Sequence, residues 1–431
     1  MVILYNNKPL THKTLVMKAY LSIAEFAEKI GKSTETLRRW DREGKLQAMR
    51  EPISNYRVYK KEQLALFENV QMTTDNKELS LNEIIPDRPY RVLELFAGAG
   101  GLAIGLEKAG LKCVALNEID HWAAETLRKN RPHWEVIEDD IKNISFEKYK
   151  GEVDVVTGGF PCQAFSYAGK KLGLQDARGT LFYEFARAVQ ETQPAICIGE
   201  NVRGLLNHDG GKTLQGMISI LDEIGYKVLE PRVLKAIYYE VPQKRERLIL
   251  VGIRKDLDIT FKYPTPSKTI FTLRDALKKG ELFDSDVPAS AGTHYPEKKK
   301  MFLDLIPPGG YWRDLPIDLQ QEYMQKSFFL GGGKTGMARR ISWDEPCLTL
   351  TCSPAQKQTE RCHPDETRPF TVREYARIQT FPDDWIFQGP VSAQYKQIGN
   401  AVPVNLARAM GKEIVRALNQ MENLILLKKQ A

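Results

Sequence analysis

One short stretch, from Val155 to Ser166, constrains the fold more than any other part of the 431-residue chain. An apolar run from Val153 to Val156 predicts a buried strand, which two glycines end. Pro161 and Cys162 follow directly, so a thiol is held at the carboxyl end of a strand. In an open α/β sheet, this edge is where ligands bind. Cys162 is therefore either a nucleophile or, as is common for a free cysteine, a small buried hydrophobic residue.

Other segments repeat this pattern of a strand followed by a glycine-rich or acidic loop. Residues 91–95 predict a strand, residues 96–101 a glycine loop and residues 102–109 a helix. Later predicted strands lead to Glu118 and to Glu200. Because the ends of such strands lie along one sheet edge, Glu200 should emerge beside Cys162. The alternation of strands and helices predicts an α/β, Rossmann-like fold.

These segments, in this order, resemble the motif set of the cytosine-C5 DNA methyltransferases of bacterial restriction-modification systems. The resemblance rests on residues 94–102, 160–163, 199–202, 243–247 and 397–403, and it spans the chain from Tyr90 to the C-terminal helix. It implies a catalytic domain that is dependent on S-adenosylmethionine. It also implies transfer of a methyl group to C5 of a flipped cytosine in a specific duplex DNA sequence, through a covalent cysteine adduct.

The chemistry of that reaction assigns roles to the candidate catalytic residues. A thiolate that adds to C6 breaks the aromaticity of the ring and makes C5 nucleophilic, so Cys162 is the predicted nucleophile. The addition pushes charge onto N3 and O2; Glu200 is the predicted donor at N3 and Arg247 at O2. Arg245 should face the same way as Arg247, to hold a phosphate or a carbonyl oxygen. The alternative for Arg245 is structural pairing with an acid such as Glu246.

The resemblance also implies a cofactor pocket along the strand ends. Glu118 should accept hydrogen bonds from the ribose hydroxyls, Ile119 should pack against the adenine, and Asp140 should contact the adenine amino group. N-capping or solvation of a loop is the other interpretation of these acids. The expected cofactor residues are Phe96, Ala97, Gly98, Gly100, Gly101, Leu102, Glu118, Ile119, Asp140, Ile141, Pro161, Leu181, Asn400, Ala401 and Val402.

The segment after Cys162 and the C-terminal half complete the predicted methyltransferase. Gln163 and Ser166 should contact the DNA, and residues 167–180 should form a lid over the substrate. The catalytic domain is expected to span residues 90–254. Proline, glycine and aromatic residues alternate through residues 255–365, which predicts a smaller target recognition domain. Residues 366–431 should supply a scaffold segment and a helix from Asn400 to about Leu418 that returns to the catalytic domain.

The first 70 residues predict a separate helical winged helix-turn-helix domain. Ser22 can cap one helix, Gly31 makes a turn, and a second helix carries Arg38, Arg39 and Arg42 on its outer side. With a predicted hairpin wing and a closing helix over residues 60–67, this unit resembles the DNA-binding domain of the MerR family of regulators. The alternative is that these arginines only solvate an exposed face. A polar linker is expected over residues 71–89.

Bulk properties limit the remaining possibilities. A net charge of +7 permits a nucleic-acid partner without establishing one. The six cysteines include no Cys-x-x-Cys pair, so no metal is expected. No signal peptide precedes the chain, and no apolar run reaches the roughly 18–20 residues of a membrane span, so we expect a cytoplasmic protein.

Two other functions fit parts of the sequence. A transfer-RNA substrate is disfavoured by the long recognition region, which transfer-RNA members of the family usually have in shortened form. A transcription regulator with secondary catalysis is disfavoured by the presence of Cys162, Glu200 and Arg247, although regulation can coexist with catalysis. We therefore predict double-stranded DNA as the substrate, a cognate restriction endonuclease as genetic partner, and the protein's own promoter as the target of the N-terminal domain.

Overall fold

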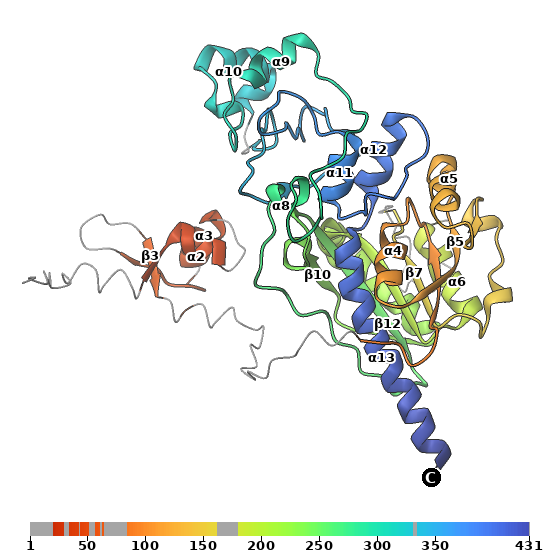
Figure 1. Cartoon of the computed structure of the whole chain (residues 1–431). Coiled ribbons are helices and arrows are strands. Elements are labelled where there is room, and N and C mark those ends of the chain that lie inside the picture. Colours follow the sequence, from red (N-terminus) through yellow and green to blue (C-terminus); the bar gives the residue numbers. More distant parts are fainter. Residues whose placement is uncertain are drawn as a thin grey trace, which may run out of the picture. The chain divides into compact units, whose positions relative to one another are not determined.

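The computed structural model describes residues 20–29, 34–42, 44–50, 57–60, 63, 84–161, 180–330 and 334–430 (Figure 1). The chain divides into two compact units, an N-terminal unit of Met1–Asn82 and a large unit of Glu83–Ala431. The boundary between them lies inside the predicted linker. The end of that linker belongs to the large unit, because Arg88 forms ion pairs with Asp154 and Glu422.

A mixed sheet forms the centre of the large unit. Its strand order is β10-β12-β8-β7-β4-β5-β6, and β9 pairs with β12. The strands from β8 to β6 are parallel, whereas β12 runs antiparallel to β8 and to β10. The strands are β4 Arg91–Leu95, β5 Lys112–Asn117, β6 Glu135–Ile137, β7 Val155–Gly158, β8 Ile196–Val202, β9 Tyr226–Val228, β10 Arg232–Lys235 and β12 Glu246–Arg254.

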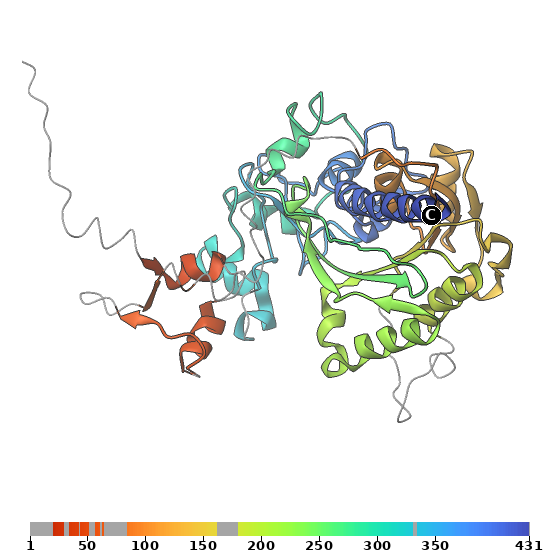
Figure 2. The same cartoon turned by 90° about the horizontal axis from the view of Figure 1, so that it is seen from below.

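Helices cover both faces of this sheet (Figure 2). On one face α4 and α13 pack on Val92 and Val155, and on the other α6 and α7 pack on Leu93 and Val156. The contact between α4 and α13 is close, since a Cβ on Gly105 would lie 2.3 Å from the Cβ of Ala407. The predicted Rossmann-like fold is thus confirmed. The helices are α4 Gly101–Lys108, α5 His121–Asn130, α6 Leu181–Thr192, α7 Lys212–Glu223, α12 Val391–Asn400 and α13 Val404–Gln430, with 3₁₀ helices at Ile141–Asn143, Glu147–Tyr149, Arg203–Gly211 and Ala236–Tyr238.

The C-terminal helix begins later than the sequence predicted. Asn400 ends α12, and a short break of three residues precedes α13 at Val404. Pro403 has no backbone N–H to donate, so the chain cannot continue one helix across it. Its carbonyl instead accepts from Ala407 N and opens the new helix. The break leaves Ala401 and Val402 free to turn toward the strand ends.

A second apolar core lies within the predicted recognition region. It joins residues from Tyr295 to Cys362 and includes Phe302, Trp312 and Tyr323. The segment just after residue 255 belongs elsewhere, because Phe261 and the residues of α8 pack in the main core. The compositional change near residue 255 therefore precedes the start of this core by about forty residues. The elements are α8 Leu273–Leu277, α9 Glu297–Asp304, α10 Ile317–Met324, β11 Gln243–Lys244 and β13 Cys347–Leu348, with 3₁₀ helices at Trp312–Asp314 and Gln325–Phe329.

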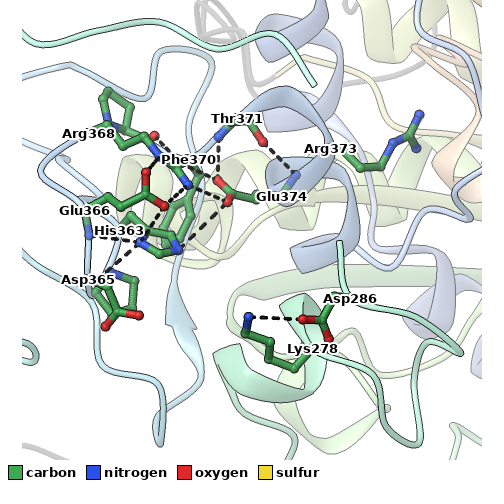
Figure 3. Close-up of polar contacts among 12 residues, drawn as sticks. Lys278, Asp286, His363, Asp365, Glu366, Arg368, Phe370, Thr371, Arg373 and Glu374 are labelled. Carbon is green, nitrogen blue, oxygen red and sulfur yellow. Dashed lines mark hydrogen bonds and ion pairs between the residues drawn. The ribbon is translucent and has the colours of Figure 1, made fainter. Parts of the chain in front are cut away.

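A polar cluster fixes the start of α11 (Val372–Ile378), where the chain leaves the recognition core (Figure 3). Thr371 and Glu374 form a reciprocal capping box, and Arg368 donates two hydrogen bonds to Glu374 and two to Glu366. The ring of His363 accepts from the backbone N–H of Glu366, 3.2 Å away. Next to this cluster, Phe370, Val372 and Ile378 pack in the main core, so α11 anchors the recognition region to the sheet.

The N-terminal unit is a small winged assembly. Ser22 caps α2 (Ile23–Lys29) as predicted, because its Oγ accepts from Glu25 N while the Glu25 carboxylate accepts from Ser22 N. Helix α3 (Thr34–Arg42) buries Leu37 and exposes Arg38, Arg39 and Arg42. Strands β1 Tyr20–Ser22, β3 Arg57–Lys60 and β2 Met49–Arg50 form an antiparallel sheet in that order. Most of the predicted closing helix over residues 60–67 lies outside the described residues.

No helix among these described segments combines the length and the apolar character that a bilayer crossing requires.

Candidate active site

A cavity of about 840 Å³ opens at the carboxyl edge of the sheet. Its wall is built from the ends of β4, β5, β7 and β8 and from the break between α12 and α13. Nearly all of the predicted cofactor residues line it, and Gly100 is the exception. The lining includes Phe96, Ala97, Gly98, Gly101, Leu102, Glu118, Ile119, Asp140, Ile141, Pro161, Leu181, Asn400, Ala401 and Val402.

The glycine loop shapes the floor of this cavity. Phe96, Gly98 and Gly100 all have positive φ values, of 56°, 54° and 83°. Gly100 is the residue that precedes α4, and a Cβ there would lie 2.8 Å from the Leu127 side chain. Its role is therefore the turn and the close approach to α5, in place of the predicted contact with a ligand.

Glu118 is held rigidly at the end of β5. Its carboxylate accepts hydrogen bonds from the backbone N–H groups of Gly98 and Asp120, at 2.7 Å each. Burial raises the pKa of Glu118 above its ordinary value. Beside it, Ile119 is 66% exposed, so an apolar side chain stands at the rim of the cavity. Asp140 lines the cavity and also caps a 3₁₀ helix by accepting from Lys142 N, so the capping interpretation is confirmed and the adenine contact stays a prediction.

Glu200 and Arg247 form a buried ion pair in the cavity wall. They lie on the antiparallel strands β8 and β12, two positions apart on the same face, and Arg247 Nε is 2.5 Å from Glu200 Oε1. Burial raises the pKa of Glu200, and the guanidinium of Arg247 partly offsets this rise. A Cβ on Gly159 would lie 2.9 Å from Glu200 Oε2, so only glycine leaves space for this carboxylate.

Asn201 is a site residue to which the sequence assigned no role. It is 3% exposed, and its side-chain amide donates to Phe160 O at 2.8 Å. It therefore ties the chain that leads to Pro161 to the strand that carries Glu200. Cys162, Gln163, Ser166 and residues 167–179 of the predicted lid lie outside the described residues, whereas Thr180, the last lid residue, caps α6 by accepting from Tyr183 N. The sequence signal for Asn201 was its position directly after Glu200, within the motif of residues 199–202.

Arg245 does not line the cavity, in contrast to its predicted catalytic contact. It is 1% exposed and donates to the carbonyl oxygens of Leu350, Gly399 and Ala401, at distances of 2.8–3.1 Å. Burial and the charge of Arg247 lower the pKa of Arg245 to about 9. Strand β12 begins only at Glu246, so the alternation expected between residues 245 and 247 does not hold. Arg245 instead fixes the chain segment that forms one wall of the cavity.

Two buried glutamines extend the hydrogen-bond network of Arg245, and we call this network the clamp. Gln243 donates to the side chain of Gln379 at 3.0 Å, and Gln379 donates to Ile398 O at 2.9 Å. Gln243 also accepts from Leu350 N, and Gln243 with Lys244 pairs with Cys347–Leu348 as a small parallel sheet. The clamp therefore links the cavity wall at Asn400–Val402 to Gln243–Lys244, before the recognition core, and to residues 347–350, near its end.

Two family descriptions match the chain. One, C-5 cytosine-specific DNA methylase, matches residues 90–416, which is more than half of the chain. The other, MerR HTH family regulatory protein, matches residues 21–85.

Individual proteins match as well. The chain is 62% identical over 408 residues to Type II methyltransferase M.Eco47II of Escherichia coli, covering 94% of this chain and 98% of that one. It is 56% identical over 402 residues to Type II methyltransferase M.PspPI of a Psychrobacter strain, covering 93% and 97%. The crystal structure of a prophage-encoded DNA modification methyltransferase of E. coli matches with 25% identity and a TM-score of 0.55, covering 77% of this chain and 99% of that chain.

Proposed function

The chain belongs to the C-5 cytosine-specific DNA methylases, and we propose that it uses S-adenosylmethionine to modify one cytosine of a specific duplex sequence. Its proposed role is that of the modification enzyme of a restriction-modification system. The main support for this proposed function is the buried pair of Glu200 and Arg247, which lines the same cavity as Pro161. Purified protein should transfer a labelled methyl group to duplex DNA, and hydrolysis should release the label as 5-methylcytosine. Label found on another base, or only on RNA, would contradict the proposal.

The residues of the cavity fit this cofactor. Glu118 retains free lone pairs that can accept from two ribose hydroxyls, and Ile119 offers an apolar surface to the adenine. Asp140 stands one strand further along, at the end of β6, where it can accept from the adenine amino group. When bound, S-adenosylmethionine supplies an electrophilic methyl group. The volume of about 840 Å³ is of the size that ligand sites of enzymes usually have.

The chain's own residues then prepare the cytosine. We assign Cys162, one residue beyond the cavity wall at Pro161, as the thiolate that adds to C6. Glu200 is the assigned proton donor to N3, and burial, which raises its pKa, favours the protonation that this role requires. Arg247 holds the Glu200 carboxyl in place and is the donor for the developing charge at O2. Addition at C6 makes C5 nucleophilic toward the methyl group, and loss of the C5 proton with elimination of the thiolate restores the aromatic ring.

Replacing Glu118 with alanine should weaken binding of S-adenosylmethionine by about 1–3 kcal/mol, the size of one or two lost hydrogen bonds. Titration calorimetry measures this directly. Glu147→Ala is the matched control, because Glu147 lies on a 3₁₀ helix whose residues are not part of the cavity lining. Unchanged affinity in the Glu118 variant would remove this residue from the site.

The rate of methyl transfer should fall as the pH rises through the raised pKa of Glu200, and Glu200→Gln should remove this fall. The pKa of Glu200 is raised in the folded protein, so the carboxyl keeps its proton at pH values where an ordinary glutamate is ionised. As the pH rises through that pKa, the proton needed at N3 is lost. A glutamine amide donates weakly but does not titrate, so the variant should be slower and lack this alkaline limb. Single-turnover rates between about pH 5.5 and 9 test this. An identical alkaline limb in both proteins would rule out Glu200 as its source.

We propose that the N-terminal unit binds a separate operator, the promoter of this gene or of a companion endonuclease. The exposed arginines of α3 support this proposal. Because the large unit already contains the residues assigned to catalysis, the N-terminal unit is free to bind other DNA. Protein beginning at Asn82 should keep methyl transfer and site choice but lose the footprint on upstream DNA. Full-length protein with Arg38→Ala and Arg42→Ala is a second test that leaves the domain in place. Equal footprints from all three proteins would contradict operator binding.

A further inference from the structure

The most buried carboxyl of the cavity wall has one oxygen without a hydrogen-bond partner among the described residues. Glu94 is the fourth residue of β4 and lines the cavity, yet it is only 2% exposed. Its Oε2 atom has no hydrogen-bond donor among the described residues, and no ion pair of Glu94 is found there either. A buried polar atom without a partner is costly to keep, so its retention at a ligand cavity calls for an explanation.

Within the described part of the chain, no positively charged group acts on Glu94. In the sheet, Glu94 lies opposite Leu116 of β5 and opposite Thr157 of β7, whose hydroxyl is also without a partner. Burial and repulsion from the Glu118 carboxylate raise the pKa of Glu94 well above its ordinary value. A second titratable group nearby is the buried Cys113 thiol of β5, whose pKa is raised by burial and by the charge of Glu94. Three cations line the cavity among the described residues. Arg247 pairs with Glu200 and Lys396 with Asp120, while Lys142 lies on the 3₁₀ helix that follows β6, two strands away from β4.

The order of the strands indicates which part of the cofactor would contact the Glu94 carboxyl. The assigned ribose and adenine contacts stand at the ends of β5 and β6, whereas the reacting groups stand at the ends of β7 and β8. Strand β4 lies between β5 and β7. The sulfur of S-adenosylmethionine lies between its ribose and its reactive methyl group, so it should lie over β4. Glu94 is on the same face of the sheet as Glu118 and Glu200. Its partner Leu116 on β5 lies two positions before Glu118, and Ile198, level with it on β8, lies two positions before Glu200.

We propose, on the basis of the proposed function, that Glu94 is the counter-charge for the sulfonium of S-adenosylmethionine and selects it over the demethylated product. In the free protein the carboxyl holds its proton. Entry of the sulfonium cation displaces this proton to solvent and leaves a carboxylate paired with the positive sulfur. After transfer the sulfur is a neutral thioether, and the buried carboxylate has lost its partner. Glu94 thus strengthens binding of the methyl donor and favours departure of S-adenosylhomocysteine.

Calorimetry with three ligands on wild type and Glu94→Gln tests this selection. The ligands are S-adenosylmethionine, an analogue with a protonated amine in place of the sulfonium, and S-adenosylhomocysteine, which keeps the ammonium but has no charge at sulfur. The variant should bind the first two about tenfold or more weakly and the third within about twofold of wild type. Equal weakening of all three ligands, or of none, would overturn the proposal. Thr157→Val is the matched control on the neighbouring strand and should not discriminate between charged and neutral sulfur.

A second measurement on the wild type alone does not depend on how the variant folds. Titrations near neutral pH in two buffers of different ionisation enthalpy give the number of protons released on binding. About one proton should be released with S-adenosylmethionine and clearly less with S-adenosylhomocysteine. Equal proton release for both ligands would contradict the proposal. If the wild type binds neither ligand, the proposed function itself fails, which is a different result.

Discussion

Cys162→Ser should lower methyl transfer by on the order of 1,000-fold or more, while binding of S-adenosylmethionine and of duplex DNA stays close to wild type. A serine hydroxyl is almost fully protonated at neutral pH, so it cannot add to C6 as a thiolate does. Glu200 and Arg247 hold each other in the cavity wall, and the substitution changes neither of them.

Trapping the adduct distinguishes a nucleophile from a structural cysteine. With duplex DNA that carries 5-fluorocytosine at the target, the wild type should form a complex that survives denaturation, because fluorine cannot leave C5 as a proton does. The serine variant should form none. Cys352→Ser is the matched control, since this exposed thiol donates to Asn400 next to the cofactor cavity and has no assigned chemistry. Methylation at a normal rate by the Cys162 variant would remove it from the mechanism.

Arg245→Met should destabilise the protein by about 3–5 kcal/mol, because three buried carbonyl oxygens lose their donor at once. Two of these oxygens, of Gly399 and Ala401, belong to the cavity wall, so cofactor affinity should fall with stability. Denaturant unfolding and calorimetric titration measure the two effects separately.

Arg247→Met is the matched comparison two residues along the chain. Its partner Glu200 can take up a proton when the guanidinium is gone, so the loss of stability should be much smaller than for Arg245→Met. Methyl transfer should nevertheless fall by on the order of 100-fold or more, since the donor to the developing charge is missing. The reverse result, with Arg247→Met unstable and Arg245→Met stable but inactive, would contradict the roles that we assign to these arginines.

The sequence predicted the sheet and the ends of its strands because those features are local. Apolar runs such as residues 153–156 give the strands, and the polar residues that follow them give the edge at which Glu118 and Glu200 line one cavity. Ordered motifs also named residues on three separate parts of the chain that line this cavity. Asn400 to Val402 reach the cavity although they lie about 300 residues after the glycine loop.

What the sequence could not predict depends on distant contacts. Arg245 and Arg247 belong to one motif, but only the fold shows that Arg245 points to carbonyl oxygens more than 100 residues away. Gly100 has the residue type of a ligand loop, yet its position is determined by Leu127 and Trp385. The recognition domain was predicted from residue 255 because the composition of residues 255–277 resembles that of a loop region, yet Leu273 and Leu277 are buried in the main core and the second core begins at Tyr295.

We propose that this chain methylates C5 of a cytosine in a defined duplex sequence through Cys162, Glu200 and Arg247. Bisulfite sequencing of plasmid DNA from bacteria that lack other cytosine-C5 methylases, expressing either the wild type or Cys162→Ser, tests it most directly. We predict that the wild type protects one cytosine position within every copy of a single short sequence and that the serine variant protects none. Protection scattered without a common sequence, protection that persists in the variant, or none with either protein would contradict the account.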